Sequence, residues 1–307
     1  MITYIIFCLS LVLLYFGGKS ILHGTLALAY KFQVSKMLVS IVIIGFGTSL
    51  PELAVTIEAV LTDYPDIALG NIVGSNIANI LLIVAIAAIL SPVLIKGSKP
   101  TTDVVVMLLA SFALYICKLF DALNAITGIV FLILLLLYVF LSYRSDVADQ
   151  AEDTNVGSET NIKIILYCLG GLFLLIAGGH LLIDSAVTIA RSFNISEAVI
   201  GLTVVAVGTS LPELTTAILA SIKKQNDVII GNIVGSNIFN IFGILGLTII
   251  IKPIPISPAM LHAGMIEMLA ASIIFSLLLL FRPQIGRGMG ACMLAGYIIY
   301  SYFLFNV

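Results

Sequence analysis

Two glutamates stand in the middle of strongly apolar stretches of this chain, each directly after a proline. Glu52 ends the hexapeptide GTSLPE that begins at Gly47, and Glu213 ends an identical hexapeptide that begins at Gly208. In a membrane-spanning stretch, a carboxylate costs roughly 2.5–3.5 kcal/mol on insertion scales and indicates a functional site. The proline removes an amide donor and clashes with the carbonyl oxygen of the glycine. This predicts a broken helix whose freed carbonyls line a cavity or bind a ligand.

A polar stripe follows each glutamate, with members four residues apart on one face of a helix. The two stripes are Asn71, Ser75 and Asn79, and Asn232, Ser236 and Asn240. Each begins within a GxxxG pattern, which lets a helix approach its neighbour closely. If these helices pack together, carboxylate, hydroxyl, amide and backbone oxygens converge, with no thiol or imidazole beside them. Such an all-oxygen set favours hard cations such as Ca²⁺ or Na⁺ over zinc or copper.

The two sets are copies of one repeat. GTSLPEL at 47–53 matches GTSLPEL at 208–214, and GNIVGSNI at 70–77 matches 231–238, an offset of 161 residues (208 − 47). Between positions 45 and 80, 20 of 36 residues are identical to their counterparts, without a gap. A purely structural kink or buried glutamate has no reason to recur in register, so the duplication favours a functional site.

The composition indicates what kind of chain carries these residues. Of 307 residues, 61% are apolar and 10% charged, and the mean hydropathy is +1.20. Soluble proteins carry about 25% charged residues, so a water-soluble enzyme, a disordered chain and a collagen-like chain are all excluded. A net charge of −2 gives no indication of a nucleic-acid partner. The chain is predicted to be an all-α polytopic membrane protein whose partner is the lipid bilayer.

Ten segments are long and apolar enough to cross a bilayer, which takes about 20 residues. They are 2–30, 37–62, 66–91, 101–118, 123–142, 162–191, 197–222, 227–251, 259–281 and 287–305. Five fall in each copy of the repeat, and an odd number inverts the second half in the membrane. The predicted fold is therefore ten transmembrane helices as two inverted five-helix repeats, 1–142 and 162–307, joined by a polar linker at 143–161. Secondary transporters with this plan bind substrate where the halves meet.

The basic residues predict the orientation of the chain. Loops after the odd-numbered spans hold ten Lys and Arg residues, and those after the even-numbered spans hold three. By the positive-inside rule, the 143–161 linker is cytoplasmic and both termini are outside. For a multi-pass protein of this kind we expect the cell (plasma) membrane as its location.

The two motifs together, GTSLPEL followed by GNIVGSN-I-x-N and present twice, resemble the alpha repeats of the calcium/cation antiporter superfamily, specifically its sodium/calcium exchanger branch. The resemblance covers both halves and implies a ten-helix fold in which helices 2, 3, 7 and 8 enclose four cation sites. It implies that Glu52 and Glu213 are shared carboxylate ligands. The other ligands that it implies are Thr48, Ser49, Thr209, Ser210, Ser75, Ser236, Asn79 and Asn240, with backbone oxygens from Gly45 and Ala206.

One departure concerns the last pair of the motif. Several relatives carry an aspartate there, whereas this chain has Asn79 and Asn240, which leaves two carboxylates in the cluster. Their charge of −2 balances one Ca²⁺ or two Na⁺, and a third Na⁺ would leave the site at +1. Three-for-one exchange is therefore implied by the resemblance alone, and the missing acid argues against potassium co-transport.

The predicted function is secondary antiport of Ca²⁺ against Na⁺ by alternating access, in which both ions compete for the same carboxylates. The resemblance implies that a helix pair formed by spans 1 and 6 moves. The ions are substrates, and no cofactor is expected. The alternative is a Ca²⁺/H⁺, or other divalent cation/H⁺, antiporter whose glutamates exchange protons.

An ion channel would need a continuous water path. An intramembrane hydrolase is not favoured, because HExxH is missing and no serine in the repeat has a histidine nearby, so the chain is not predicted to be an enzyme. The oligomeric state stays open.

Overall fold

The computed structural model describes residues 2–95, 101–146, 160–193, 206–254 and 264–305. Most of the predicted linker, and the predicted starts of the spans 197–222 and 259–281, lie outside these residues. The described chain is helical apart from two strands of two residues each. The prediction of an all-α architecture is thus confirmed.

The first half contains three long helices and two helices that are interrupted. Its elements are α1 (Ile2–Phe32), α2 (Lys36–Val39), η1 (Ser40–Gly45), α3 (Phe46–Thr48), α4 (Leu50–Leu61), α5 (Pro65–Ala78), η2 (Asn79–Ile83), α6 (Val84–Leu90), β1 (Val93–Leu94), α7 (Thr101–Leu119) and α8 (Ala125–Asp146). The elements labelled η are π-helical turns inserted between α-helical segments, a feature found frequently at functional sites.

The second half repeats this order of long and interrupted helices. Its elements are α9 (Asn161–Ser192), α11 (Ala206–Gly208), α12 (Leu211–Ile222), α13 (Asn226–Ile238), η4 (Phe239–Leu245), α14 (Gly246–Ile251), α16 (Met265–Phe281), β2 (Gln284–Ile285) and α17 (Arg287–Phe305). The strands β1, which follows α6, and β2, which follows α16, pair antiparallel and connect the two halves. The described part of each predicted span is mostly helical.

Six described helices or runs of helices are long and apolar enough to cross a membrane, and the bent segment from Lys36 to Leu61 would make a seventh. The helices α12 and α16 are apolar but shorter. The two runs that carry the polar stripes, Pro65–Leu90 and Asn226–Ile251, are the most buried of the six. The chain is thus a multi-pass membrane protein with the stripes at its centre, and the count of ten spans stays a prediction.

The helix breaks lie where the prolines predict them. Pro51 and Pro212 each stand in the first turn of a helix, α4 and α12, since proline suits a helix start and not its interior. The segments before and after Ser49 meet at an angle of 42°. Ser210, the counterpart of Ser49, has nearly the same backbone angles, φ −88° and ψ 11° against −83° and 6°.

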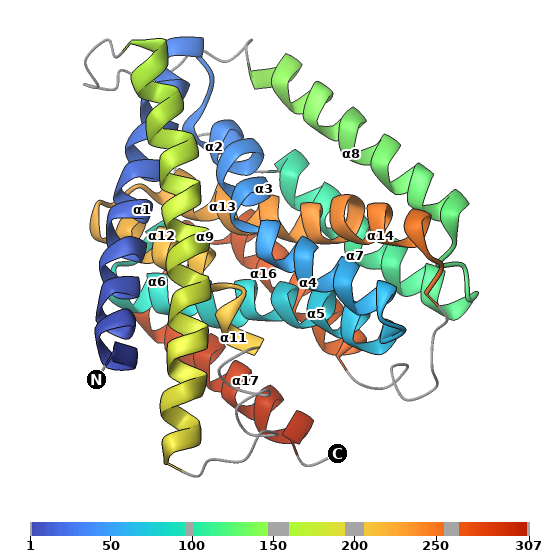
Figure 1. The fold of residues 1–307 in the computed structure, drawn as a ribbon. Helices are drawn as coiled ribbons and strands as arrows, with labels where there is room; N and C mark the ends of the chain where they lie inside the picture. Colours follow the sequence, from blue (N-terminus) through green and yellow to red (C-terminus); the bar gives the residue numbers. More distant parts are fainter. Residues whose placement is uncertain (1, 96–100, 147–159, 194–205, 255–263, 306–307) are drawn as a thin grey trace.

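The long helices α1 and α9 lie side by side and antiparallel, and in Figure 1 they run steeply across the other helices. Gly17 of α1 lies against the backbone of α9 near Leu175, and Gly178 of α9 lies against the backbone of α1 near Leu14. A Cβ atom at Gly17 would stand 2.8 Å from the Leu175 nitrogen. Glycine therefore permits the close contact between these helices, and the pair forms one continuous unit.

Candidate functional site

Glu52 and Glu213 lie together in the interior, one from each half of the chain. Each stands in the first turn of its helix, α4 or α12, and each is 1% exposed. Ser49 donates a hydrogen bond to Glu213 Oε1 at 3.2 Å, and Ser210 donates to Glu52 Oε1 at 3.1 Å. The serine at each helix break thus reaches the glutamate of the opposite half. The two carboxylates face inward and not toward lipid.

Four buried oxygen atoms of this cluster have no hydrogen-bond partner. They are Oε2 of Glu52, Oε2 of Glu213, Oδ1 of Asn79 and Oδ1 of Asn240, and their residues are each 1% exposed. An unsatisfied buried acceptor costs about 1–3 kcal/mol, and more when it is charged. All four atoms are acceptors, so a cation would satisfy them.

Side chains of α13 and α5 hold Asn79 and Asn240 in place through their amide nitrogens. Asn79 Nδ2 donates to Asn237 Oδ1 at 3.0 Å, whereas Asn240 Nδ2 donates to Asn76 Oδ1 at 2.9 Å and to Ser75 Oγ at 3.0 Å. These bonds occupy the amide nitrogens, which leaves the amide oxygens as the free ends of the side chains. Asn79 and Asn240 therefore present oxygen, the atom that binds a hard cation.

The hydroxyl side chains of the predicted ligand set are all buried near the helix breaks. Thr48 donates to the Ile44 carbonyl oxygen at 2.8 Å, and Ser75 donates to that of Ile72 at 3.1 Å. Thr209 is 6% exposed, at the break that precedes α12. These hydroxyls keep lone pairs with which they could bind a cation.

Of the two predicted backbone ligands, the structure describes the contacts of Gly45, whereas it describes only the backbone of Ala206. Ser236 donates to the Gly45 carbonyl oxygen at 3.2 Å, and a Cβ atom at Gly45 would stand 2.9 Å from the Ser236 nitrogen. Gly45 thus brings η1 into direct contact with α13. Ala206 is the first described residue of α11, and its side chain lies outside the described part.

Asn71 and Asn232, the first members of the stripes, hydrogen-bond to the backbone of the glutamates and not to their carboxylates. Asn71 Nδ2 donates to the backbone oxygen of Glu52 at 3.1 Å, and Asn232 Nδ2 donates to that of Glu213 at 3.4 Å. Each glutamate is therefore fixed through its own backbone by the helix that follows in the chain.

Sequence reasoning did not single out Asn76 and Asn237 as members of the site. Besides holding the two asparagines, Asn76 Nδ2 lies 3.8 Å from the Met268 sulfur, and Asn237 Nδ2 lies 3.8 Å from the Met107 sulfur. Asn76 and Asn237 are counterparts under the offset of 161 (237 − 76). Their identity in both copies of GNIVGSN was the signal that could have found them.

Two further acidic residues lie apart from the cluster. Glu267 lies inside the predicted span 259–281, and the structure places it in the first turn of α16, where Oε2 accepts a hydrogen bond from the Gly264 amide at 3.0 Å. It caps this helix. Glu58 is exposed on α4, one and a half turns beyond Glu52. Among the described residues, no three His, Cys, Asp or Glu side chains gather as a metal cluster.

Comparisons with known proteins agree over nearly the whole chain. The family model described as sodium/calcium exchanger protein matches residues 2–144 and 163–306. The inner membrane protein YrbG of Escherichia coli (strain K12) is 34% identical over 96% of this chain and 94% of its own length. The sodium/calcium exchanger MaX1 of Methanosarcina acetivorans is 27% identical over 100% of this chain and 99% of its own.

A solved structure shows the same fold. The sodium-calcium exchanger NCX_Mj, soaked with 2.5 mM Na⁺ and 0.1 mM Ca²⁺, superposes with a TM-score of 0.85 at 31% sequence identity, over 97% of each chain. The likeness therefore extends over both halves of the chain. The chain belongs to the sodium/calcium exchanger family, a family of membrane antiporters and not of enzymes.

Proposed function

We propose that this protein exchanges Ca²⁺ for Na⁺ across the membrane by alternating access, with both ions bound in turn between the glutamate motifs of the two halves. The observation that carries the proposal is the set of four buried acceptor oxygens without partners, two from carboxylates and two from amides. The ligand set is the one predicted above, Glu52, Glu213, Thr48, Ser49, Thr209, Ser210, Ser75, Ser236, Asn79, Asn240, Gly45 and Ala206.

The charge of the cluster explains why the two ions exclude each other. Two buried carboxylates without a compensating cation are costly, because several kcal/mol per ion are lost on leaving water. One Ca²⁺ or two Na⁺ neutralise them. Bound together, the two kinds of ion would leave an excess of positive charge in the same low-dielectric space. Competition for the same oxygens therefore couples the exit of one ion to the entry of the other.

Reciprocal contacts support two inverted repeats. Asn76 approaches Met268 as Asn237 approaches Met107. Each residue of one pair is the counterpart of a residue of the other pair, because 237 − 76 and 268 − 107 both equal 161. Ser111 and Ser272, themselves counterparts, meet at 3.1 Å, as residues on a two-fold axis would. The antiparallel packing of the counterpart helices α1 and α9 agrees with this relation. We propose residues 1–142 and 162–307 as the two repeats and 143–161 as their linker.

Contacts between loops support the proposed alternation of ten spans. Lys31 after the first span contacts Asn161 at the start of the sixth, and β1 after the third span pairs with β2 after the ninth. On the other side, Asp63 after the second span pairs with Lys252 after the eighth at 2.5 Å. Each contact joins loops assigned to one side. With the basic residues, this supports a cytoplasmic linker and outside termini. We propose the plasma membrane as the location, and the similarity to a protein named as an inner membrane protein supports it.

The oxygen-rich surroundings of the glutamates favour Na⁺ over H⁺ as the counter-ion. A proton needs only a carboxylate, whereas Na⁺ needs several oxygen ligands, and buried hydroxyls and amides of both halves stand beside Glu52 and Glu213. Proton exchange is the second candidate, because the same buried carboxylates can carry protons.

Flux measurements separate the two candidates. In reconstituted vesicles loaded with Na⁺, we expect rapid ⁴⁵Ca²⁺ uptake at equal pH on both sides, and little uptake when choline replaces the internal Na⁺. The matched arm imposes a pH gradient without Na⁺. Uptake driven by that gradient alone would replace Na⁺ by H⁺ as the counter-ion, and a conductance without any counter-ion requirement would indicate a channel.

A further inference from the structure

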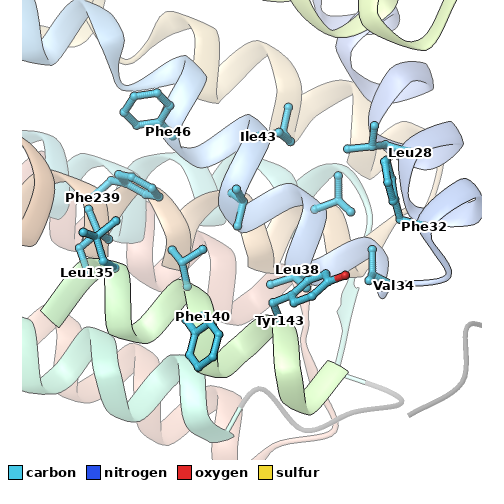
Figure 2. A pocket seen from close by; sticks show the side chains of 14 residues that line it. Leu28, Phe32, Val34, Leu38, Ile43, Phe46, Leu135, Phe140, Tyr143 and Phe239 are labelled. Carbon is cyan, nitrogen blue, oxygen red and sulfur yellow. The ribbon is translucent and has the colours of Figure 1, made fainter. Parts of the chain in front are cut away.

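An apolar groove of about 630 Å³ lies on the outer surface between the first helices and α8, and it is open along one side (Figure 2). Its walls are apolar side chains from three regions of the chain. From α1 and the segment that follows, these include Leu28, Phe32 and Leu38; from α8 they include Leu136 and Phe140; and Phe239 of η4 stands at the inner end.

The groove runs inward from one end of the helices. Along α8 its lining extends from Tyr143 to Leu135, which is about 12 Å at 1.5 Å per residue. Phe32 and Tyr143 stand at the mouth, and Phe46 and Phe239 stand at the inner end with ring centroids 5.0 Å apart (Figure 2). An open apolar groove of this length can take an extended, flexible apolar chain, with the polar end of that chain at the mouth.

Positive charge surrounds the mouth. Lys31 precedes Phe32, Lys36 begins α2, and Arg144 follows Tyr143 and lies with its guanidinium 5.5 Å from the Phe140 ring centroid. Because Phe140 lines the groove, its contact with Arg144 holds one of these cations at the mouth of the groove. Basic groups beside an apolar, membrane-facing groove are complementary to a lipid with an anionic head.

We propose that this groove binds an anionic phospholipid, with an acyl chain between α1, η1 and α8 and the headgroup at Lys36 and Arg144. The inner end of the acyl chain would then contact Phe46, which follows Gly45, and Phe239, which precedes Asn240. The acyl chain would thus pack against two segments that also carry residues of the proposed ion site. This proposal does not depend on which counter-ion the protein uses.

The chain contains no tryptophan, so a single introduced indole reports the lipid beside it. Leu136→Trp places the indole in the groove, and Phe173→Trp places it on α9, where the native side chain is likewise 70% exposed. Vesicles contain a minor fraction of brominated phospholipid, anionic in one series and zwitterionic in the other. We expect the anionic lipid to quench Leu136→Trp severalfold more strongly than the zwitterionic lipid, and to quench Phe173→Trp no more than that lipid does.

Charge variants and salt complete the test. The double variant Lys36→Gln with Arg144→Gln should abolish the excess quenching, because each lost charge lowers the relative affinity for the anionic lipid roughly fivefold. The control is Lys223→Gln, which removes a charge on the same predicted side but away from the groove and should preserve the excess quenching. High salt should weaken it in the unchanged protein, which makes the test independent of how the double variant folds. Equal quenching by both lipids at position 136, or an excess that survives both the double variant and salt, would overturn the proposal.

Discussion

At the scale of single residues, the two glutamates are the positions on which transport should depend most. Glu52→Gln or Glu213→Gln keeps the shape of the side chain but removes half of the cluster's negative charge. Because affinity of an oxygen site for Ca²⁺ depends on the number of charged ligands, we expect uptake to fall on the order of 100-fold. The measurement is Na⁺-dependent ⁴⁵Ca²⁺ uptake in vesicles.

A matched control comes from the same helix. Glu58→Gln removes the exposed carboxylate of α4 and should leave uptake within about twofold of the unchanged protein, as is usual for surface substitutions. Insertion and folding are checked by a monodisperse peak in detergent. A well-folded Glu52→Gln or Glu213→Gln protein with normal exchange would remove that glutamate from the proposed site.

Asn240→Asp tests the departure from the aspartate that several relatives carry. The aspartate cannot donate to Ser75 and Asn76 as the amide does, but it adds a third acidic group that can take up a proton. We expect Ca²⁺ uptake to become more dependent on pH than in the unchanged protein. Thermal stability should fall, because the two lost hydrogen bonds leave buried acceptors without a donor. The check is uptake across a pH series, with the counterpart Asn79→Asp measured beside it. Identical pH profiles for all three proteins would contradict this role of position 240.

At the scale of helices, the break at Ser49 is what brings the two halves together. Pro51→Ala removes the cause of the break, because alanine is more favourable than proline in a helix interior by about 3 kcal/mol. The variant should be as stable as the unchanged protein or more so, yet transport should fall at least severalfold, because a continuous helix would carry Ser49 away from Glu213. Thermal unfolding in detergent and ⁴⁵Ca²⁺ uptake measure the two effects. Full transport by a protein in which the helix had straightened would show the break to be dispensable.

The contact between α13 and η1 depends on glycine. A Cβ atom at Gly235 would stand 2.8 Å from both the Cα and carbonyl oxygen of Ile41, which are backbone atoms that cannot turn aside. Gly235→Ala should therefore destabilise the protein by about 1–3 kcal/mol, the usual effect of overpacking. Gly296→Ala on α17, where no described atom lies within 4 Å, is the control and should be neutral or slightly stabilising. Equal melting temperatures for the two variants would contradict the close packing.

Which features could be predicted from the sequence depends on how local their causes are. Pro51 acts on its own helix, so the helix break was predictable. The GxxxG pattern that includes Gly235 predicted a close helix contact, but not that Ile41 is the partner. The duplication then extended each local result to the other half. By contrast, Asn76 was overlooked because its partners, Asn240 and Met268, are distant in sequence. The position of Glu267 at a helix start was likewise missed, since an uninterrupted apolar run conceals where a helix begins.

At the scale of the whole molecule, the family resemblance implies that α1 and α9, which pack closely on each other, move as one unit past the helices that carry the glutamates. A crosslink inside that unit should then be harmless, whereas one from the unit to α12 should stop transport. The structure supplies both positions. A Cβ atom at Gly24 of α1 would lie 2.7 Å from the sulfur of Cys168 on α9, and one at Gly18 would lie 3.1 Å from Cγ2 of Thr215 on α12. Both separations are within the reach of a disulfide.

Two engineered proteins test this motion, each in a background without the other native cysteines. Gly24→Cys can pair with Cys168, and Gly18→Cys can pair with Thr215→Cys in a protein that also lacks Cys168. Under oxidation we expect the first protein to retain Na⁺-dependent Ca²⁺ uptake and the second to lose it, with uptake recovered on reduction. The reduced proteins control for the substitutions themselves, because only the covalent link differs. If oxidation left the second protein active, or inactivated the first as fully as the second, α1 and α9 would not be the moving unit, since a covalent link restricts transport only where the linked helices must separate.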